Sequence, residues 1–88
     1  MSWTVEVKPA AEKQYHKLDK KTKARVLAAL TDLEELQNPF QHNDIRPLTG
    51  ELKGDRRLRV GEWRILIAPR AETQTLHVYA ILPRGGAY

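Results

Sequence analysis

The chain has 88 residues, 41% of them hydrophobic and 30% charged, and its net charge at pH 7 is +4. This length predicts a single small domain spanning residues 1–88, and the composition is too apolar for a disordered tail. The absence of cysteine excludes disulfide scaffolds, zinc ribbons and thiol nucleophiles, and fits a cytoplasmic protein. No apolar run approaches the roughly 20 residues of a membrane-spanning helix, and the start lacks a signal-peptide pattern, so no membrane contact is expected.

A strand and a short helix are expected at the start of the chain. Residues 3–8 alternate between apolar and polar side chains and are rich in Trp, Val and Thr, which predicts a half-buried strand. Pro9 suits the first turn of the helix that follows, because its missing N–H has no helical partner to lose there. Apolar side chains then recur at helical spacing from Ala11 to Leu18, which makes this helix short and amphipathic.

A second, longer helix is expected directly after the first. Asp19 is its candidate N-cap, since a carboxylate can accept hydrogen bonds from the free backbone N–H groups of a first turn. The apolar stripe starts at Val26 and reaches Leu36. Asn38 ends the helix, because a residue that precedes a proline is pushed out of the helical region. Almost nothing separates the two helices, so we expect a tight antiparallel pair.

The second half of the chain is predicted to consist mostly of strands. Residues 40–54 are punctuated by proline and glycine and are expected to form an irregular surface connection. The alternating segments 57–60 and 63–67 flank a two-residue turn that begins with Gly61, which is typical of a type II′ hairpin. A last strand is expected over residues 76–82. The element order is therefore β-α-α-β-β-β, an α+β fold with a helical hairpin on one face of an antiparallel sheet and the other face partly open to water.

The excess positive charge is concentrated in one part of the chain. Between residues 53 and 70, six basic residues meet two acidic ones, and this difference of +4 equals the net charge of the whole chain. A concentrated basic patch is typical of proteins that bind a polyanion, above all nucleic acid. The alternative is a solvated strand face that keeps a small protein soluble.

Strand periodicity predicts which side of the sheet carries the arginines. If the apolar residues of the hairpin lie under the helices, then Arg57, Arg59 and Arg64 converge on the other face. Converging guanidinium groups repel one another, and each can bind phosphate oxygens through two parallel hydrogen bonds. We therefore favour an anion site over the alternative in which the arginines pair with their acidic neighbours, Asp55 and Glu62.

The hairpin segment resembles the RelE/ParE toxin superfamily of toxin–antitoxin modules. Residues 57–67 contain a basic-x-basic strand, a Gly-acidic turn and an aromatic residue followed by arginine, as that superfamily typically does. Residues 48–50 are similar to its Leu-x-Gly motif, and residues 81–88 are similar to its final strand, arginine and terminal aromatic residue. The element order matches as well, so the resemblance covers essentially the whole chain.

The resemblance implies a RelE-like, microbial-ribonuclease-like fold and the function of a toxin from a type II toxin–antitoxin module. RelE-type members bind the ribosomal A site and cut the mRNA there, with the 2′-OH of the RNA as the attacking group. The implied activity is thus a ribosome-dependent RNA endonuclease that inhibits translation. Its implied partners are a cognate RelB-like antitoxin, the ribosome with its rRNA, and mRNA. Two alternatives remain, a ParE-like inhibitor of DNA gyrase and a non-catalytic nucleic-acid-binding module.

The resemblance also implies a set of site residues. The catalytic set is Arg57, Arg59, Arg64, Arg84 and Tyr88, and the RNA-binding set is Lys53 and Arg56. Arginine stays protonated and donates in a planar fork, which suits it to stabilise a dianionic phosphorane but not to act as a base. Catalysis is therefore expected to depend on positioning and charge stabilisation. No cluster has the spacing of a metal site, so neither metal nor cofactor is expected.

Overall fold

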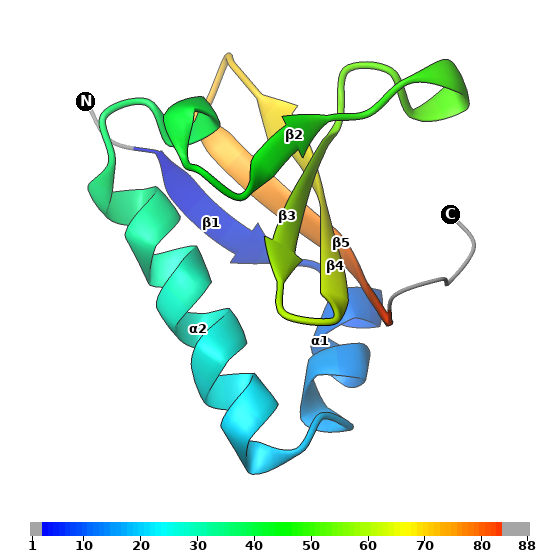
Figure 1. Cartoon of the computed structure of the whole chain (residues 1–88). Helices are drawn as coiled ribbons and strands as arrows, with labels where there is room; N and C mark the ends of the chain where they lie inside the picture. Colours follow the sequence, from blue (N-terminus) through cyan, green and yellow to red (C-terminus); the bar gives the residue numbers. More distant parts are fainter. Residues whose placement is uncertain (1–2, 84–88) are drawn as a thin grey trace.

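The structure, a computed structural model, describes residues 3–83, and these are built around one five-stranded sheet (Figure 1). The strands are β1 (Thr4–Val7), β2 (Ile45–Pro47), β3 (Arg56–Val60), β4 (Trp63–Arg70) and β5 (Thr75–Pro83). They lie in the order β1-β5-β4-β3-β2 across the sheet. The two longest strands, β4 and β5, are therefore direct neighbours near its middle.

Two helices and two short 3₁₀ turns connect the strands of the described region. They are α1 (Pro9–His16), α2 (Lys20–Glu35), η1 (Pro39–Gln41) and η2 (Gly50–Leu52). As predicted, Asp19 caps α2, and its carboxylate accepts the backbone N–H of Thr22 at 3.1 Å. Hydrogen bonds from the hydroxyl and backbone N–H of Thr22 favour the charged form and lower the pKa of Asp19. Neither helix has the length and apolar character needed to cross a membrane.

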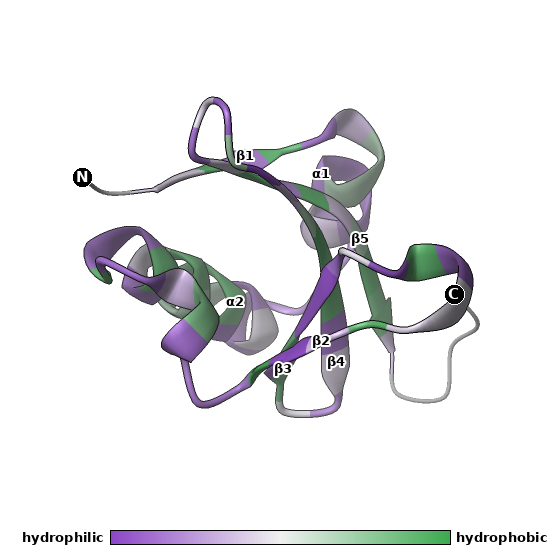
Figure 2. Cartoon of the chain, turned by 90° about the horizontal axis from the view of Figure 1, so that it is seen from above, coloured by the Kyte–Doolittle hydropathy of each residue, from purple (hydrophilic) through white to green (hydrophobic). Residues whose placement is uncertain are grey.

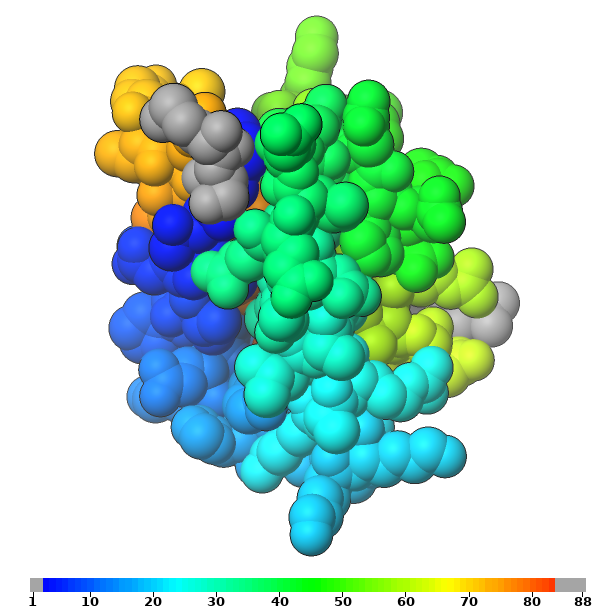
Figure 3. Space-filling view, turned by 90° about the vertical axis from the view of Figure 1, so that its left-hand side faces the viewer, coloured from blue at the N-terminus to red at the C-terminus, as the bar shows by residue number. Residues whose placement is uncertain are grey.

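One face of the sheet packs against both helices and forms the hydrophobic core. Helix α1 packs on β5, whereas α2 packs on β1 and β3 and runs down the middle of this side of the molecule (Figure 3). The buried cluster comprises Ala11, Leu18, Val26, Leu30, Leu33, Ile45, Leu58, Val60, Ile65, Ile67, Leu76, Val78 and Ile81. The apolar residues of β3 and β4 thus lie under the helices, as the strand periodicity predicts.

The opposite face of the sheet is bordered by the connection between β2 and β3. Figure 2 shows this connection, with η2, on the side of the sheet away from α2. Leu66 is buried, with 2% of its surface exposed, yet it lies outside the helical core cluster and opposite Arg57 in the strand ladder. This second face is therefore bordered by a loop at one end, and most of its side chains on β4 and β5 are buried or half-buried. We call it the arginine face, because it carries the side chains described below.

The α+β class and the placement of the helices on one face are confirmed, but the sheet is not purely antiparallel. Strand β1 pairs parallel to β5, with Thr4 opposite Thr75, while the other neighbouring strands pair antiparallel. The predicted element order also lacks a strand, because β2 forms inside the segment that was expected to be irregular. It pairs with β3 through Ile45 and Leu58. A three-residue strand that ends in proline is too short to show the period-two alternation.

The two helices do not form the tight pair that their short connection predicts. They diverge from that connection (Figure 1), and each packs mainly on the sheet. Burial of apolar side chains explains this arrangement, because the apolar stripes of both helices face the same sheet surface. The prediction was wrong in treating the loop length as sufficient to set the angle between the helices.

Candidate phosphate-binding site

Four arginines gather on the arginine face. In the ladder between β3 and β4, Arg59 lies directly opposite Arg64, and in the ladder between β2 and β3, Arg46 lies directly opposite Arg57. Directly opposed residues of an antiparallel pair share a face, and like charges in such positions destabilise a sheet. We call Arg46, Arg57, Arg59 and Arg64 the arginine cluster. The sequence prediction includes three of its members and lacks Arg46, because no strand was predicted there.

The arginine cluster forms no ion pair with an acidic side chain of the described region, although Asp44 lies beside it. The ion pairs formed within residues 3–83 involve Lys8, His16 and His77 rather than these arginines. The carboxylate of Asp55, one of the two acidic neighbours considered above, accepts a hydrogen bond of 2.7 Å from the hydroxyl of Tyr79. Within the described part of the chain, these positive charges are therefore not offset by ion pairs.

Two guanidinium nitrogens of the cluster are buried without a hydrogen-bond partner in the described part of the chain. They are Nε of Arg57 and Nη1 of Arg64. Both side chains are half-buried rather than exposed. A buried donor without a partner costs about 1–3 kcal/mol, and more when it is charged. An anion that accepted from these nitrogens would remove that penalty, which favours a negatively charged ligand at the cluster.

A hollow of about 190 Å³ lies among three members of the cluster. Its lining consists of Arg46, Arg57 and Arg59 together with Asn43 and Asp44. Nη1 of Arg46 donates to two nearby backbone carbonyl groups, each at 2.8 Å, and this holds its guanidinium in place. We call this space the arginine hollow. Three guanidinium groups in its lining suit it to a phosphate group, although the carboxylate of Asp44 also lines it.

The other predicted site residues do not join the cluster in the described structure. Arg56 points to the opposite side of β3, where its guanidinium lies over the ring of Phe40, 5.1 Å from the ring centroid. Lys53 is exposed directly after η2. Arg84 and Tyr88 lie outside the described residues. The structure therefore brings Arg57, Arg59 and Arg64 together and separates Arg56 from them.

Tyr79 is a residue of the arginine face that sequence reasoning missed. The register between β4 and β5 shifts beside Leu66, and Tyr79 is the extra residue of this bulge. Burial and the hydrogen bond to Asp55 raise the pKa of Tyr79 well above its ordinary value, so the hydroxyl keeps its proton. Because Asp55 directly precedes β3, this contact anchors the start of the strand that carries Arg57. Bulges often re-aim a side chain next to a functional site, but a bulge has no signal in this sequence.

The described residues contain no group of three or more His, Asp or Glu side chains that could hold a metal ion. Two acidic side chains near this face have partners of their own. Asp55 accepts from Tyr79, and Glu6 accepts from Lys8 at 3.1 Å. The chemistry that this face supports is thus the binding of anions by cationic donors.

A family model described as the ParE toxin of type II toxin–antitoxin systems, parDE, matches residues 5–88. Among solved structures, the RelBE2 toxin–antitoxin complex from Mycobacterium tuberculosis is 26% identical with a TM-score of 0.80, covering 96% of this chain and 100% of that one. The archaeal RelE–RelB complex from Pyrococcus horikoshii OT3 is 24% identical with a TM-score of 0.79, covering 99% and 100%.

The isolated RelE toxin of E. coli shares the fold at 14% identity, with a TM-score of 0.77 and coverage of 98% of this chain and 88% of that one. No curated protein matches the sequence. The family match extends over nearly the whole chain, and it confirms the resemblance that the hairpin motif suggests. The chain therefore belongs to the ParE toxin family of the RelE/ParE superfamily and is the toxin of a type II toxin–antitoxin system.

Proposed function

We propose that this toxin is a ribosome-dependent endoribonuclease that cleaves mRNA in the ribosomal A site. The observation that carries the proposal is a pair of buried guanidinium nitrogens, on Arg57 and Arg64, that have no hydrogen-bond partner within residues 3–83 and belong to a cluster of four arginines. A phosphodiester supplies what these nitrogens lack, namely a negative charge and two non-bridging oxygens that accept hydrogen bonds.

The reaction proposed is attack by the RNA on itself. The 2′-oxygen bonds to the adjacent phosphorus and loses its proton, and the 5′-oxygen leaves and gains one, which gives a 2′,3′-cyclic phosphate and a 5′-OH. Charge on the phosphorane rises during attack, so fixed guanidinium donors bind it more tightly than they bind the starting phosphodiester. Arginine remains charged at neutral pH, and the raised pKa of Tyr79 keeps its hydroxyl protonated. We therefore assign these side chains to positioning and charge stabilisation.

The proposed partners follow from the same activity. In this proposal the ribosome orients the mRNA so that the attacking 2′-oxygen, the phosphorus and the leaving 5′-oxygen are in line. Such fixed geometry lowers the barrier to cleavage. A cognate RelB-like antitoxin would neutralise the toxin, as is consistent with the RelE–RelB complexes among the structural neighbours. The proposed location is the cytoplasm, where translating ribosomes are found.

A second candidate is inhibition of DNA gyrase, which the ParE description of the matching family favours. In that case the arginine cluster would bind an acidic protein surface or a nucleic-acid phosphate and would not cleave a phosphodiester. Gyrase inhibition explains the positive charge of the arginine face equally well. It gives less reason for two donors to be buried without a partner among the described residues.

Mapping of RNA ends separates the candidates. We expect the purified toxin, added to ribosomes that translate a defined mRNA, to produce cuts within A-site codons and new 5′-OH ends. Addition of the cognate antitoxin should suppress the cuts. Intact mRNA together with double-strand DNA breaks in a parallel gyrase reaction would overturn the nuclease proposal in favour of gyrase inhibition. If neither effect appears, the third candidate, a non-catalytic nucleic-acid-binding module, is favoured.

A further inference from the structure

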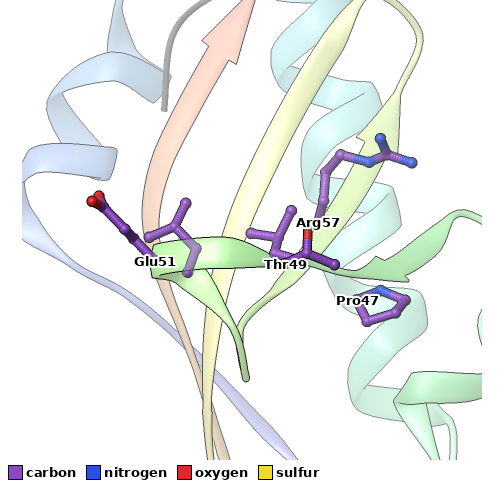
Figure 4. A pocket seen from close by; sticks show the side chains of 6 residues that line it. Pro47, Thr49, Glu51 and Arg57 are labelled. Atoms are coloured by element: carbon purple, nitrogen blue, oxygen red, sulfur yellow. The ribbon is translucent and has the colours of Figure 1, made fainter.

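A second hollow adjoins the arginine hollow and shares Arg57 with it. It has a volume of about 500 Å³ and lies along the connection between β2 and β3 (Figure 4). Its lining residues are Pro47, Leu48, Thr49, Glu51, Leu52 and Arg57. We call it the loop hollow. Because Arg57 belongs to both linings, a ligand whose charged group sits in the arginine hollow can extend directly into the loop hollow.

The chemistry of the loop hollow changes from one end to the other. Figure 4 shows the guanidinium of Arg57 at one end and the carboxylate of Glu51 at the other, with Thr49 between them. The other three lining residues, Pro47, Leu48 and Leu52, are apolar. A nucleotide has the same succession of groups, since it joins an anionic phosphate to a flat base that has apolar faces and a polar edge. Unstacked RNA bases are commonly held in this way, against side chains and by hydrogen bonds to their edges.

The loop that forms this hollow is fixed by its own backbone hydrogen bonds. The N–H of Leu48 donates to the carbonyl of Asp55 at 3.0 Å, and the N–H of Asp55 donates to the carbonyl of Leu52 at 3.0 Å. Gly50 begins η2 with a φ of +71°, a left-handed conformation that glycine adopts without strain. A preformed loop loses little conformational entropy when a ligand binds, so the hollow is organised before any nucleotide arrives.

We propose that the loop hollow is a base-recognition subsite, with Glu51 as the group that selects the base; this rests on the proposed function, in which the arginine cluster holds an RNA phosphate. An ionised carboxylate only accepts hydrogen bonds. It therefore favours a base edge with an exocyclic amino group, as in cytosine, adenine or guanine. Uracil instead presents carbonyl oxygens on both sides of its single edge N–H, and these repel a carboxylate. Cleavage is thus directed away from uridine at this position.

Binding of two nucleotides that differ mainly in this amino group tests the proposal. We expect 3′-CMP, titrated into ¹⁵N-labelled toxin, to shift the backbone amide signals of residues 49–52 and to bind roughly five- to tenfold more tightly than 3′-UMP. The variant Glu51→Gln should bind the two nucleotides equally, because a carboxamide can both donate and accept. The matched control Glu72→Gln changes an exposed carboxylate in the turn between β4 and β5, and should keep the wild-type preference.

Equal affinity for the two nucleotides in the wild type, or shifts that leave residues 49–52 unchanged, would overturn the subsite. So would a preference for 3′-CMP that persists in Glu51→Gln. The titration needs no ribosome and no cleavage, so it is independent of the nuclease assay. Base-selective binding by a toxin that leaves mRNA intact would support the subsite and contradict the nuclease. A-site cleavage without base-selective binding would support the nuclease and contradict the subsite.

Discussion

Replacement of Arg64 by alanine is expected to lower the rate of mRNA cleavage by about 10²–10³-fold and to leave the protein folded. Nη1 of Arg64 has no hydrogen-bond partner among the described residues, and the proposal assigns the reacting phosphate to this side chain. Arg64 also faces Arg59 across the strand ladder, and its removal relieves a repulsion between like charges. The measurement is the single-turnover rate of A-site cleavage, together with the urea midpoint of unfolding.

One further variant separates the charge of Arg64 from its planar geometry, and a second serves as a control. Arg64→Lys keeps the charge but loses the planar fork, so its rate should lie between those of the wild type and Arg64→Ala. Arg25→Ala removes an exposed arginine from the helical side and should leave the rate unchanged. A wild-type rate for Arg64→Ala would contradict the proposed site. A large fall in its urea midpoint would show that Arg64 serves the fold instead.

Replacement of Ile65 by alanine is expected to destabilise the protein by about 2–5 kcal/mol. Ile65 is fully buried, and it lies between Leu58 on β3 and Ile81 on β5, at the centre of the sheet. A small domain has a stability of about 5–15 kcal/mol, so this substitution removes a large share of it. Urea unfolding at neutral pH measures the effect.

The same experiment has a matched control on the helical side. Leu27 is 57% exposed on α2, so Leu27→Ala removes the same kind of apolar group with little loss of burial. Its effect should be within about 0.5 kcal/mol. If Ile65→Ala were as mild as Leu27→Ala, the core described here would be misplaced, and with it the strand that positions Arg64.

Much of the site was predictable because strand alternation is a local property. Apolar residues at every second position of β3 and β4 have to face the helices, and this forces Arg57, Arg59 and Arg64 to the other side. The cap at Asp19 was also predictable, since it depends on residues within one turn of the helix. In each case the residues that determine the outcome are close together in the sequence.

The features that could not be predicted from the sequence depend on contacts between segments that are far apart in the chain. Arg46 joins the cluster only because a three-residue strand pairs with β3. Tyr79 depends on a bulge that interrupts the alternation of β5, and the parallel pairing of β1 depends on how the helices return the chain to the sheet. Arg56 was grouped with its basic neighbours by charge, although its position in the alternation sends it to Phe40. Its case shows that periodicity was a better guide here than charge density.

The central claim, that the arginine cluster holds a phosphodiester, is tested most directly by the side-chain N–H signals of the arginines. The whole toxin, labelled with ¹⁵N, is titrated with an RNA oligonucleotide that carries one 2′-deoxy sugar and so cannot be cleaved there. We predict that the Nε–H signals of Arg57, Arg59 and Arg64 shift together and become protected from solvent exchange, while that of Arg56 stays in place. Unchanged signals from those three arginines while the RNA binds would contradict the account.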